Sequence, residues 1–310
     1  MRRASSKGRS LLDAAAAYAT RYLAGLATRP VAPTDEALER LATLDRPLPQ
    51  SPADPRAVLE ELDRVGSPAT VASAGGRYFG FVIGGSLPVT LAANWLAGAW
   101  DQDAGLGVAA PGAARIEAIA LRWLLDALGL PSGCAADSWA LDAHKWLNVP
   151  YDSGLALCRD GAALRAAMAA SAAYLVQGTG REPDDYTPEL SRRARGVEIW
   201  AALASLGRPG LADLVERCCR HATRFAERLR AARYEVLNEV VLNQVLVSFG
   251  PDETTRRVIA RVQTEGTCWC GGTVWHGRAA MRISVSSWQT TDQDVERSVE
   301  AIGRVAASLT

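Results

Sequence analysis

A lone lysine in an apolar segment is the feature that most constrains this chain. Arginine supplies nearly all of the 34 basic residues, and the lysines are Lys7 and Lys145. Lys145 follows His144 within the segment 136–154, which carries tryptophan and leucine on both sides of the pair. Arginine stays charged in proteins, whereas a desolvated lysine can lose its proton and form a Schiff base with a carbonyl. The alternative is a lysine whose stem lies along apolar surface while its amine reaches water.

The residues around Lys145 form a longer motif. It reads Asp142-Ala-His-Lys-Trp146 and continues with Asn148, Pro150 and Gly154. This motif resembles the cofactor-lysine signature of the pyridoxal-phosphate-dependent group II decarboxylases, a family that includes the aromatic-L-amino-acid, histidine and glutamate decarboxylases. The resemblance implies that Lys145 binds pyridoxal 5'-phosphate as a Schiff base and that His144 contacts the cofactor beside it.

Other candidate site residues come from the same resemblance. Phe81 and Ile83 lie in a glycine- and aromatic-rich run, 75–88, which resembles the segment that lines the family's substrate pocket. Tyr174 matches a tyrosine on a mobile loop that the family links to protonation of the substrate carbon. Each has a structural alternative, because glycine loops also pack aromatic rings into cores and loop tyrosines are often half-buried.

Three arginines are candidates for binding anions. Arg192 and Arg193 resemble an Arg-Arg segment of the family and have the chemistry to hold a phosphate or a carboxylate. Arg282 lies in an alternating strand pattern, where related transaminases place an arginine that meets the substrate carboxylate. For all three, the alternative is a charge on a solvated face.

The resemblance implies an α/β, aspartate-aminotransferase-like fold (pyridoxal-phosphate fold type I) in three parts. These are an N-terminal helical arm at 1–75, a large cofactor-binding domain at 76–206, and an α+β small domain at 207–310. In the family, roughly 100 residues or more, the size of a small domain, separate the counterparts of Pro131 and Asp137. The large domain is therefore expected to be truncated internally near 131–137.

The missing section has chemical and structural consequences. In the family it carries a Gly/Ser turn for the cofactor phosphate, a histidine that stacks on the pyridine ring, and an aspartate that pairs with the ring nitrogen. It also supplies central strands, so its loss should leave sheet edges and apolar helix faces uncovered.

Local signals predict several elements. Pro111 and Gly129 bracket a helix over 111–128, with Ile116, Ala120, Trp123, Leu124, Ala127 and Leu128 as its apolar stripe. Residues 154–158 and 281–286 have the pattern of strands. Thr291, followed by Asp294, predicts the start of a C-terminal helix.

Composition excludes several classes of protein. The formal net charge is zero, which gives no indication of nucleic-acid binding, and no run of eighteen apolar residues predicts a membrane span. The basic N-terminus is read as a polar tail that leads into a helix. The cysteines have no disulfide-framework spacing, so a cytoplasmic location is expected. Cys268, Cys270 and His276 offer three metal ligands without an evident fourth, and no metal site is predicted.

The sequence therefore predicts decarboxylation of a small-molecule L-amino acid through a Lys145 Schiff base, impaired by the missing segment, in a homodimer joined by the helical arm. The alternative is a non-catalytic remnant or dimerisation module of the same family. Another reaction of the same cofactor, oxidative deamination or transamination, is a third reading.

Overall fold

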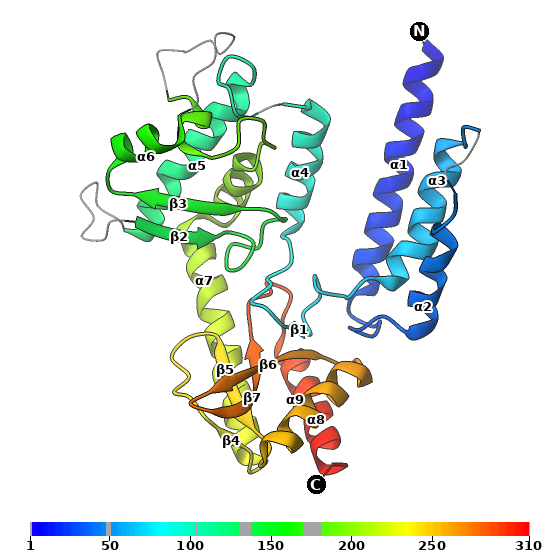
Figure 1. Ribbon diagram of the computed structural model, residues 1–310, viewed down its shortest axis with the longest axis vertical. Helices are drawn as coiled ribbons and strands as arrows, with labels where there is room; N and C mark the ends of the chain where they lie inside the picture. Colours follow the sequence, from blue (N-terminus) through cyan, green and yellow to red (C-terminus); the bar gives the residue numbers. More distant parts are fainter. Residues whose placement is uncertain (1, 48–50, 103, 130–137, 170–180, 310) are drawn as a thin grey trace. The chain divides into compact units, whose positions relative to one another are not determined.

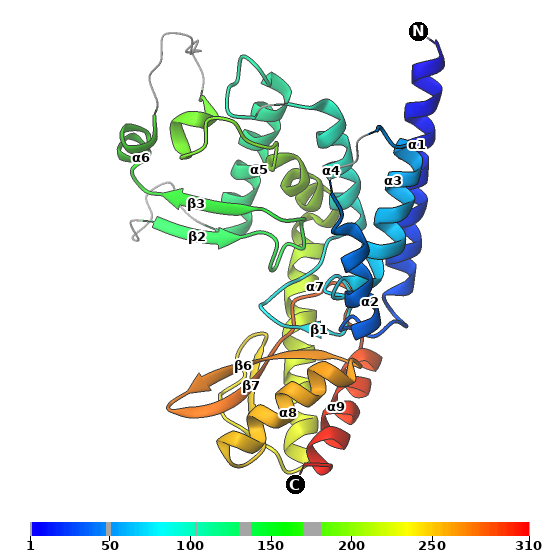
Figure 2. The same cartoon turned by 45° about the vertical axis from the view of Figure 1, so that its right-hand side comes forward.

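The computed structural model describes residues 2–47, 51–102, 104–129, 138–169 and 181–309. These residues form two compact units, which are treated separately below. The first unit combines residues 1–81 with 218–310, and the second consists of residues 82–217. Figures 1 and 2 show the elements of both units.

The α-helices are α1 (Arg2–Gly25), α2 (Asp35–Arg40), α3 (Pro55–Glu61), α4 (Pro88–Trp100), α5 (Pro111–Leu128), α6 (Gly161–Met168), α7 (Gly196–Ala231), α8 (Asp252–Glu265) and α9 (Asp292–Ala307). The strands are β1 (Tyr78–Phe79), β2 (Ser138–Asp142), β3 (Gly154–Cys158), β4 (Glu235–Val236), β5 (Gln244–Ser248), β6 (Trp269–Trp275) and β7 (Arg278–Ser284). Short 3-10 or π turns occur at Leu41–Leu44, Leu62–Gly66, Ser67–Ala69 and Pro183–Tyr186.

A mixed sheet forms the core of the first unit. The order of its described strands is β1-β6-β7-β5-β4, with β1 parallel to β6 and the other pairs antiparallel. Helix α8 contacts β6, β7 and α9, and Figure 2 shows it alongside the β6–β7 hairpin. The second half of α7 contributes Phe225 and Leu229, whose side chains are fully buried. Apolar burial of this kind is the main stabilising term for such a layer.

Buried Arg77 ties the helical arm to this sheet. Its guanidinium donates to the carbonyl oxygens of Leu26, Ala27 and Arg29 in the arm and to that of Thr267 at the start of β6. Val31 also donates its backbone N–H to Gly266 O at 2.8 Å. The arm therefore has a fixed base, because a buried guanidinium must keep its hydrogen bonds.

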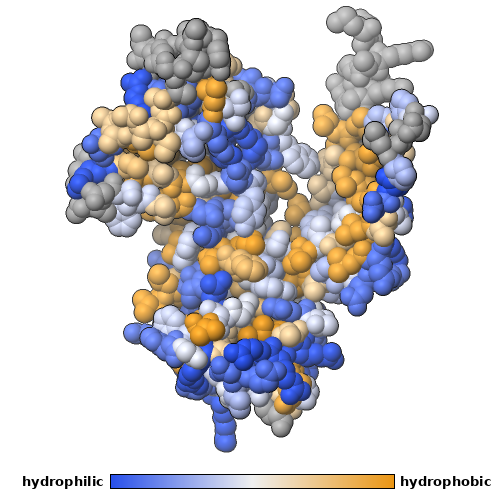
Figure 3. All heavy atoms as spheres, in the orientation of Figure 1, coloured by the Kyte–Doolittle hydropathy of each residue, from blue (hydrophilic) through white to orange (hydrophobic). Residues whose placement is uncertain are grey.

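The rest of the arm leaves apolar side chains in contact with solvent. In Figure 3 hydrophobic patches lie over the helices of the arm. The exposed large side chains are Leu12, Leu38, Leu41, Leu44, Val58 and Leu62. Short helices gain most of their stability from packing an apolar face, so this face is incompletely covered within the chain described.

The second unit is helical around one hairpin. Small residues of α4, α5 and α7 pack together in its core. Strands β2 and β3 pair with each other in an antiparallel ladder, and no other sheet occurs among the described residues of this unit. Both strands are largely accessible to solvent. Helix α4 contains no charged residue, yet Trp95, Leu96 and Trp100 are about half-exposed. The exposed strands of the hairpin and the exposed apolar face of α4 agree with the expectation that missing central strands leave sheet edges and helix faces uncovered.

Several sequence-based predictions agree with these elements. Helix α5 begins at Pro111 and ends before Gly129, which has the left-handed φ of 62°. Residues 154–158 form β3 as predicted, and β7 covers the predicted strand up to Ser284. Thr291 and Asp294 form a complete capping box on α9.

The predicted apolar stripe of α5 is partly wrong. Its buried face consists of Ala113, Glu117, Ala120 and Leu124. Trp123 and Leu128 are 37% and 44% exposed, and Trp123 instead stacks on Trp200, with ring centroids 6.1 Å apart. A buried ion pair takes the place of an apolar contact at Glu117, as described below. The three-part division at 75 and 206 stays a prediction.

Candidate functional site

Lys145 lies in the loop 143–153, which connects β2 to β3. The loop is closed at its base by the Ala143 N–H, which donates to Ser153 O at 2.9 Å. Lys145 donates its own backbone N–H to Asp142 O at 3.1 Å. The antiparallel ladder of β2 and β3 therefore holds both ends of the loop, as a hairpin does.

Asn148 fixes the far side of the loop. It adopts the left-handed conformation (φ 54°), which asparagine tolerates better than most residues. Its side-chain amide donates to the carbonyl oxygens of Lys145 and Trp146 at 3.2 and 3.0 Å. Its own carbonyl accepts from the Leu87 N–H at 2.8 Å, immediately before α4. A Cβ at Gly84 would lie 2.6 Å from Asn148 Nδ2, so only glycine allows this close approach.

His144 is buried and its protonation can be assigned from its contacts. Its Nδ1 lies 2.6 Å from Val149 O. Because a carbonyl oxygen only accepts, Nδ1 carries the proton and Nε2 is a bare acceptor. Burial lowers the pKa of His144, so the neutral form is favoured. Nε2 is buried and has no hydrogen-bond partner among the described residues. The Tyr151 ring lies over the imidazole, with centroids 3.5 Å apart.

The Lys145 amine is accessible. Its side chain is 45% exposed, and Nζ lies 3.8 Å from Oδ2 of Asp142. The other carboxylate oxygen of Asp142 accepts the His144 backbone N–H at 3.0 Å. The loop thus presents a primary amine on a fixed backbone. The preceding residue is a buried neutral imidazole whose Nε2 has no hydrogen-bond partner among the described residues. This arrangement suits covalent capture of an aldehyde.

Arg195 holds the end of the loop through Asp152. Its Nε and Nη2 donate to the two carboxylate oxygens at 2.9 and 2.7 Å. These bonds lower the pKa of Asp152 to about 2 from its usual 3.8. Bidentate pairing of this kind is the strongest geometry available to an arginine and a carboxylate.

We expect Asp152→Asn to lower stability in a pH-dependent way. The folded pKa lies below the unfolded one, so the stabilisation is complete above about pH 4 and is lost as pH falls towards about 2. The carboxylate is 65% exposed, so the cost near neutral pH should be only about 0.2–1 kcal/mol. Urea midpoints of both proteins between pH 7 and pH 2.5 measure this, and a gap that does not narrow in acid would contradict it.

Two of the three predicted anion-binding arginines are already paired. Arg192 Nη2 donates to Glu117 at 2.6 Å, and Arg193 Nη1 donates to Glu198 at 2.6 Å. Glu198 is completely buried and also accepts from Asn94. These carboxylates neutralise the guanidinium groups within the unit, which favours a structural role for the arginines. The sequence analysis missed both glutamates, although Glu117 stands at helical spacing from Ala113, Ala120 and Leu124.

The other predicted positions belong to different parts of the chain. Phe81 ends the first unit and is 61% exposed, whereas half-buried Ile83 belongs to the second unit. Tyr174 lies outside the described residues. Arg282 is half-buried on β7, and its Nε has no hydrogen-bond partner in the described part of the chain. The roles assigned to these four residues stay predictions.

The cysteine pair near β6 is buried. A hydrogen bond with Cys268, together with burial, raises the pKa of the Cys270 thiol well above its usual value. A metal ligand must be the thiolate, which this environment disfavours. Within the described ranges, no three histidine, cysteine, aspartate or glutamate side chains are placed to hold a metal ion.

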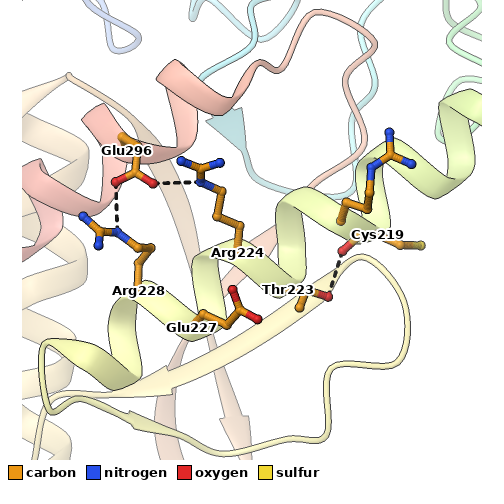
Figure 4. Close-up of a pocket in the computed structure, with 7 residues that line it drawn as sticks. Cys219, Thr223, Arg224, Glu227, Arg228 and Glu296 are labelled. Carbon is orange, nitrogen blue, oxygen red and sulfur yellow. Dashed lines mark hydrogen bonds and ion pairs between the residues drawn. The ribbon is translucent and has the colours of Figure 1, made fainter.

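An open groove of about 630 Å³ lies between α7 and α9 in the first unit (Figure 4). Glu296 accepts hydrogen bonds from Nε of Arg224 and Nε of Arg228, at 2.8 and 2.9 Å. Figure 4 shows both arginines converging on this carboxylate. The groove is thus bridged by an ion-pair network that joins two helices. Its lining residues are Cys219, Arg220, Thr223, Arg224, Glu227, Arg228 and Glu296.

We expect Glu296→Gln to lower the thermal midpoint of unfolding slightly. This decrease should be smaller in high salt than in low salt. The hydrogen bond from Arg224 is the main cause of the lowered pKa of Glu296. The stabilisation is therefore present above the unfolded carboxyl pKa and is lost as pH falls through the lower folded value. Dissolved salt should weaken the attraction between such exposed charges. Thermal melts at neutral pH in low and high salt test this, and an equal loss in both would argue against an electrostatic role.

No helix in the described ranges is both long enough and apolar enough to cross a bilayer.

Comparison with known proteins identifies relatives of this chain. A family model described as the pyridoxal-dependent decarboxylase conserved domain matches residues 132–250, which include the Lys145 loop. Histidine decarboxylase of Drosophila melanogaster is 27% identical over 183 residues, which cover 56% of this chain and 21% of that protein. Aromatic-L-amino-acid decarboxylase of Drosophila lebanonensis is 26% identical over 178 residues, which cover 55% of this chain and 44% of the relative. The matched regions thus span less than half of each relative.

The structural comparisons agree on the fold. The structure of Oryza sativa TDC with PLP and tryptamine superimposes with a TM-score of 0.91 at 16% identity, covering 98% of each chain. Rhodiola rosea 4-hydroxyphenylacetaldehyde synthase gives a TM-score of 0.84 at 15% identity, covering 99% of this chain and 98% of the other. These similarities confirm the predicted α/β, fold type I class.

The loop that carries Lys145, the matching family model and the decarboxylase relatives lead to the same assignment. Over residues 132–250, the chain is similar to the pyridoxal-dependent decarboxylase conserved domain, and the relatives compared are amino-acid decarboxylases.

Proposed function

We propose that this chain binds pyridoxal 5'-phosphate covalently through Lys145 and decarboxylates an L-amino acid to the corresponding amine. The observation that carries the proposal is the half-exposed Lys145 amine on a loop fixed by β2, β3 and Asn148. This loop lies within the segment that matches the family model. A cytoplasmic enzyme acting on a small-molecule substrate is the context we propose.

The loop residues fit the covalent attachment of the cofactor. Lys145 is the primary amine that such attachment requires, and its stem is not enclosed. His144 Nε2 is a buried acceptor without a partner in the described part of the chain, so a hydroxyl or a protonated phosphate oxygen would satisfy it. Lys145 and His144 are therefore the residues that would hold the group.

The chain's own residues have separable roles. The cofactor, when bound, provides an electron sink for the pair left by the departing carboxylate. Asn148 and Asp152 keep the loop backbone fixed, so that the lysine meets its target without further ordering. Tyr174, outside the described residues, is proposed to return a proton to the substrate carbon.

The test is spectroscopic and chemical. Purified protein is incubated with pyridoxal phosphate, freed of excess cofactor, and scanned in the visible range. It is then offered a panel of aromatic, acidic and basic L-amino acids, with amine, aldehyde, keto acid and carbon dioxide measured separately. Amine and carbon dioxide in equal amounts support decarboxylation. Aldehyde would indicate oxidative deamination, and a keto acid would indicate transamination.

A non-catalytic remnant is the second candidate. Its support is the exposed β2–β3 hairpin and the uncharged, half-exposed α4, which are incompletely covered in the described chain. In addition, among the described residues the carboxylate in contact with Lys145 is that of Asp142, which also accepts the His144 backbone N–H, so it is not available for the pyridine nitrogen. A chain that shows no visible band and no product would favour this candidate.

We also propose a homodimer. The exposed apolar faces of the arm and of α4 favour burial against a second copy. Sedimentation equilibrium measures the state directly, and a monomer at high micromolar concentration would exclude the dimer.

A further inference from the structure

Tyr151 covers the buried imidazole of His144. The two ring centroids lie 3.5 Å apart, and the ring planes are inclined by 31°. His144 is only 4% exposed, whereas Tyr151 is 61% exposed. The phenol ring therefore lies between the imidazole and solvent. Both residues belong to the loop 143–153 of the second unit.

The backbone of Tyr151 is anchored to the start of α7. Arg193 Nη2 donates to Tyr151 O at 3.1 Å, and Nη1 of the same guanidinium donates to Glu198 at 2.6 Å. A guanidinium has donors on both branches of its planar fork, so it can join a carboxylate to a backbone carbonyl. Arg193 therefore connects the loop to α7 within the second unit.

Glu198 fixes the orientation of this arginine. Its carboxylate is completely buried, and its Oε1 also accepts from Asn94 of α4 at 2.6 Å. A buried carboxylate must keep its partners, because an unpaired buried charge is costly. The guanidinium of Arg193 is thus held on one side by α4 and α7, and its other branch meets Tyr151 O.

The cover protects the hydrogen bond that orients the imidazole. His144 Nδ1 donates to Val149 O at 2.6 Å, which leaves Nε2 as an acceptor. A hydrogen bond is stronger where water is excluded, and an unrestrained imidazole can turn about its last side-chain bond. Without the Tyr151 ring, water would reach the imidazole and compete for Val149 O, so that both tautomers would be populated.

We propose that Tyr151 is a positioning residue: anchored by Arg193 and Glu198, its ring holds the imidazole of His144 in the tautomer that leaves Nε2 as an acceptor. This inference rests on the proposed function and deepens it, because Nε2 is the atom offered to a hydroxyl or a protonated phosphate oxygen of the cofactor. It also gives Arg193 a role other than anion binding.

The chain is suited to a direct measurement, because its only histidines are His144, His221 and His276. Long-range proton–nitrogen correlation spectra of protein with isotope-labelled histidine, recorded without cofactor, report the tautomer of each ring. His144→Gln identifies the signals of residue 144, which should show a protonated Nδ1. Tyr151→Leu should replace this pattern by the average of two exchanging tautomers. Tyr151→Phe, which keeps a ring, should retain it.

The anchor is tested by removing the arginine. Arg193→Gln should shift the His144 pattern in the same direction as Tyr151→Leu, but it leaves Glu198 buried without its cation and so costs stability. The double variant Arg193→Met with Glu198→Gln removes both charges together and leaves Asn94 its acceptor. Circular dichroism shows that each variant is folded. Arg208→Gln is the matched control, because Arg208 pairs with Asp126 on the surface of the same unit.

The second measurement is the binding of pyridoxal phosphate, followed by the visible band. The dissociation constant should rise about three- to tenfold in Tyr151→Leu, as expected for the loss of one oriented hydrogen bond. It should stay unchanged in Tyr151→Phe and in Arg208→Gln.

An unchanged His144 pattern in Tyr151→Leu or in the folded double variant would overturn the proposal, as would an unchanged affinity for pyridoxal phosphate in Tyr151→Leu. Failure of the proposed function looks different. In that case the unsubstituted protein shows no visible band, while the tautomer of His144 in the cofactor-free protein still reports whether Tyr151 holds the imidazole.

Discussion

Lys145→Ala should abolish the visible absorption of the cofactor-treated protein and lower amine production by about three orders of magnitude or more, as loss of a covalent catalytic group typically does. The cofactor can form a Schiff base only with a primary amine, and no other lysine lies in the loop 143–153. The only other lysine in the chain is Lys7. Borohydride reduction followed by peptide mapping should therefore find the reduced cofactor on Lys145 alone, an assignment that few proteins make so simple.

Lys145→Arg is the matched control for this prediction. Arginine keeps the positive charge beside Asp142 and most of the side-chain volume, but it cannot lose its proton in a protein. It should preserve the thermal midpoint and still lack the visible band. An equal band in the alanine variant, or label on Lys7, would show that the cofactor does not use this loop.

Among the substitutions predicted to affect stability, Phe225→Ala should lower the free energy of unfolding most, by about 3–5 kcal/mol. Phe225 is completely buried on α7, and its ring meets the ring of Phe79 edge-on, with centroids 5.0 Å apart. Truncation removes the transfer free energy of the ring, leaves a cavity, and breaks a favourable aromatic pair. Urea denaturation followed by circular dichroism measures the change. If two transitions are seen, only that of the first unit should move.

Two variants calibrate this measurement. Phe225→Leu retains much of the volume and should cost clearly less than the alanine variant. Leu242→Ala removes a side chain that is 57% exposed, and its effect should stay within about 0.5 kcal/mol. A cost for Phe225→Ala no larger than that for Leu242→Ala would mean that the Phe79–Phe225 core is not formed as described.

Local signals explain why parts of the fold could be predicted from the sequence. Pro111 supplies a backbone angle suited to a first helical turn, and Gly129 supplies the left-handed residue that ends it, so α5 has the predicted bounds. Thr291 and Asp294 cap α9 through bonds that span only three residues. These features depend on neighbours in the chain and need no knowledge of the packing.

The apolar pattern of the sequence predicted the bounds of α5 better than it predicted which of its side chains are buried. Glu117 lies on the buried face of α5, although it was not part of the predicted stripe, because Arg192 and Arg181 meet its carboxylate from a distant segment. Trp123 was expected in the core and is instead partly exposed against Trp200. A helical pattern shows which residues share a face, but the partner that covers the face decides whether a charge can be buried there.

The sequence by itself indicated the resemblance to the decarboxylases, the α/β class and the candidate lysine, because Lys145 stands in one contiguous motif. Only the tertiary structure decided which nitrogen of His144 carries its proton, since Val149 O is the acceptor that fixes it. It also decided that Arg192 and Arg193 are neutralised by Glu117 and Glu198. The Arg192–Glu117 contact joins residues 75 positions apart, whereas the His144–Val149 and Arg193–Glu198 contacts each span five. The energies of all three depend on burial and on geometry that local sequence patterns do not encode.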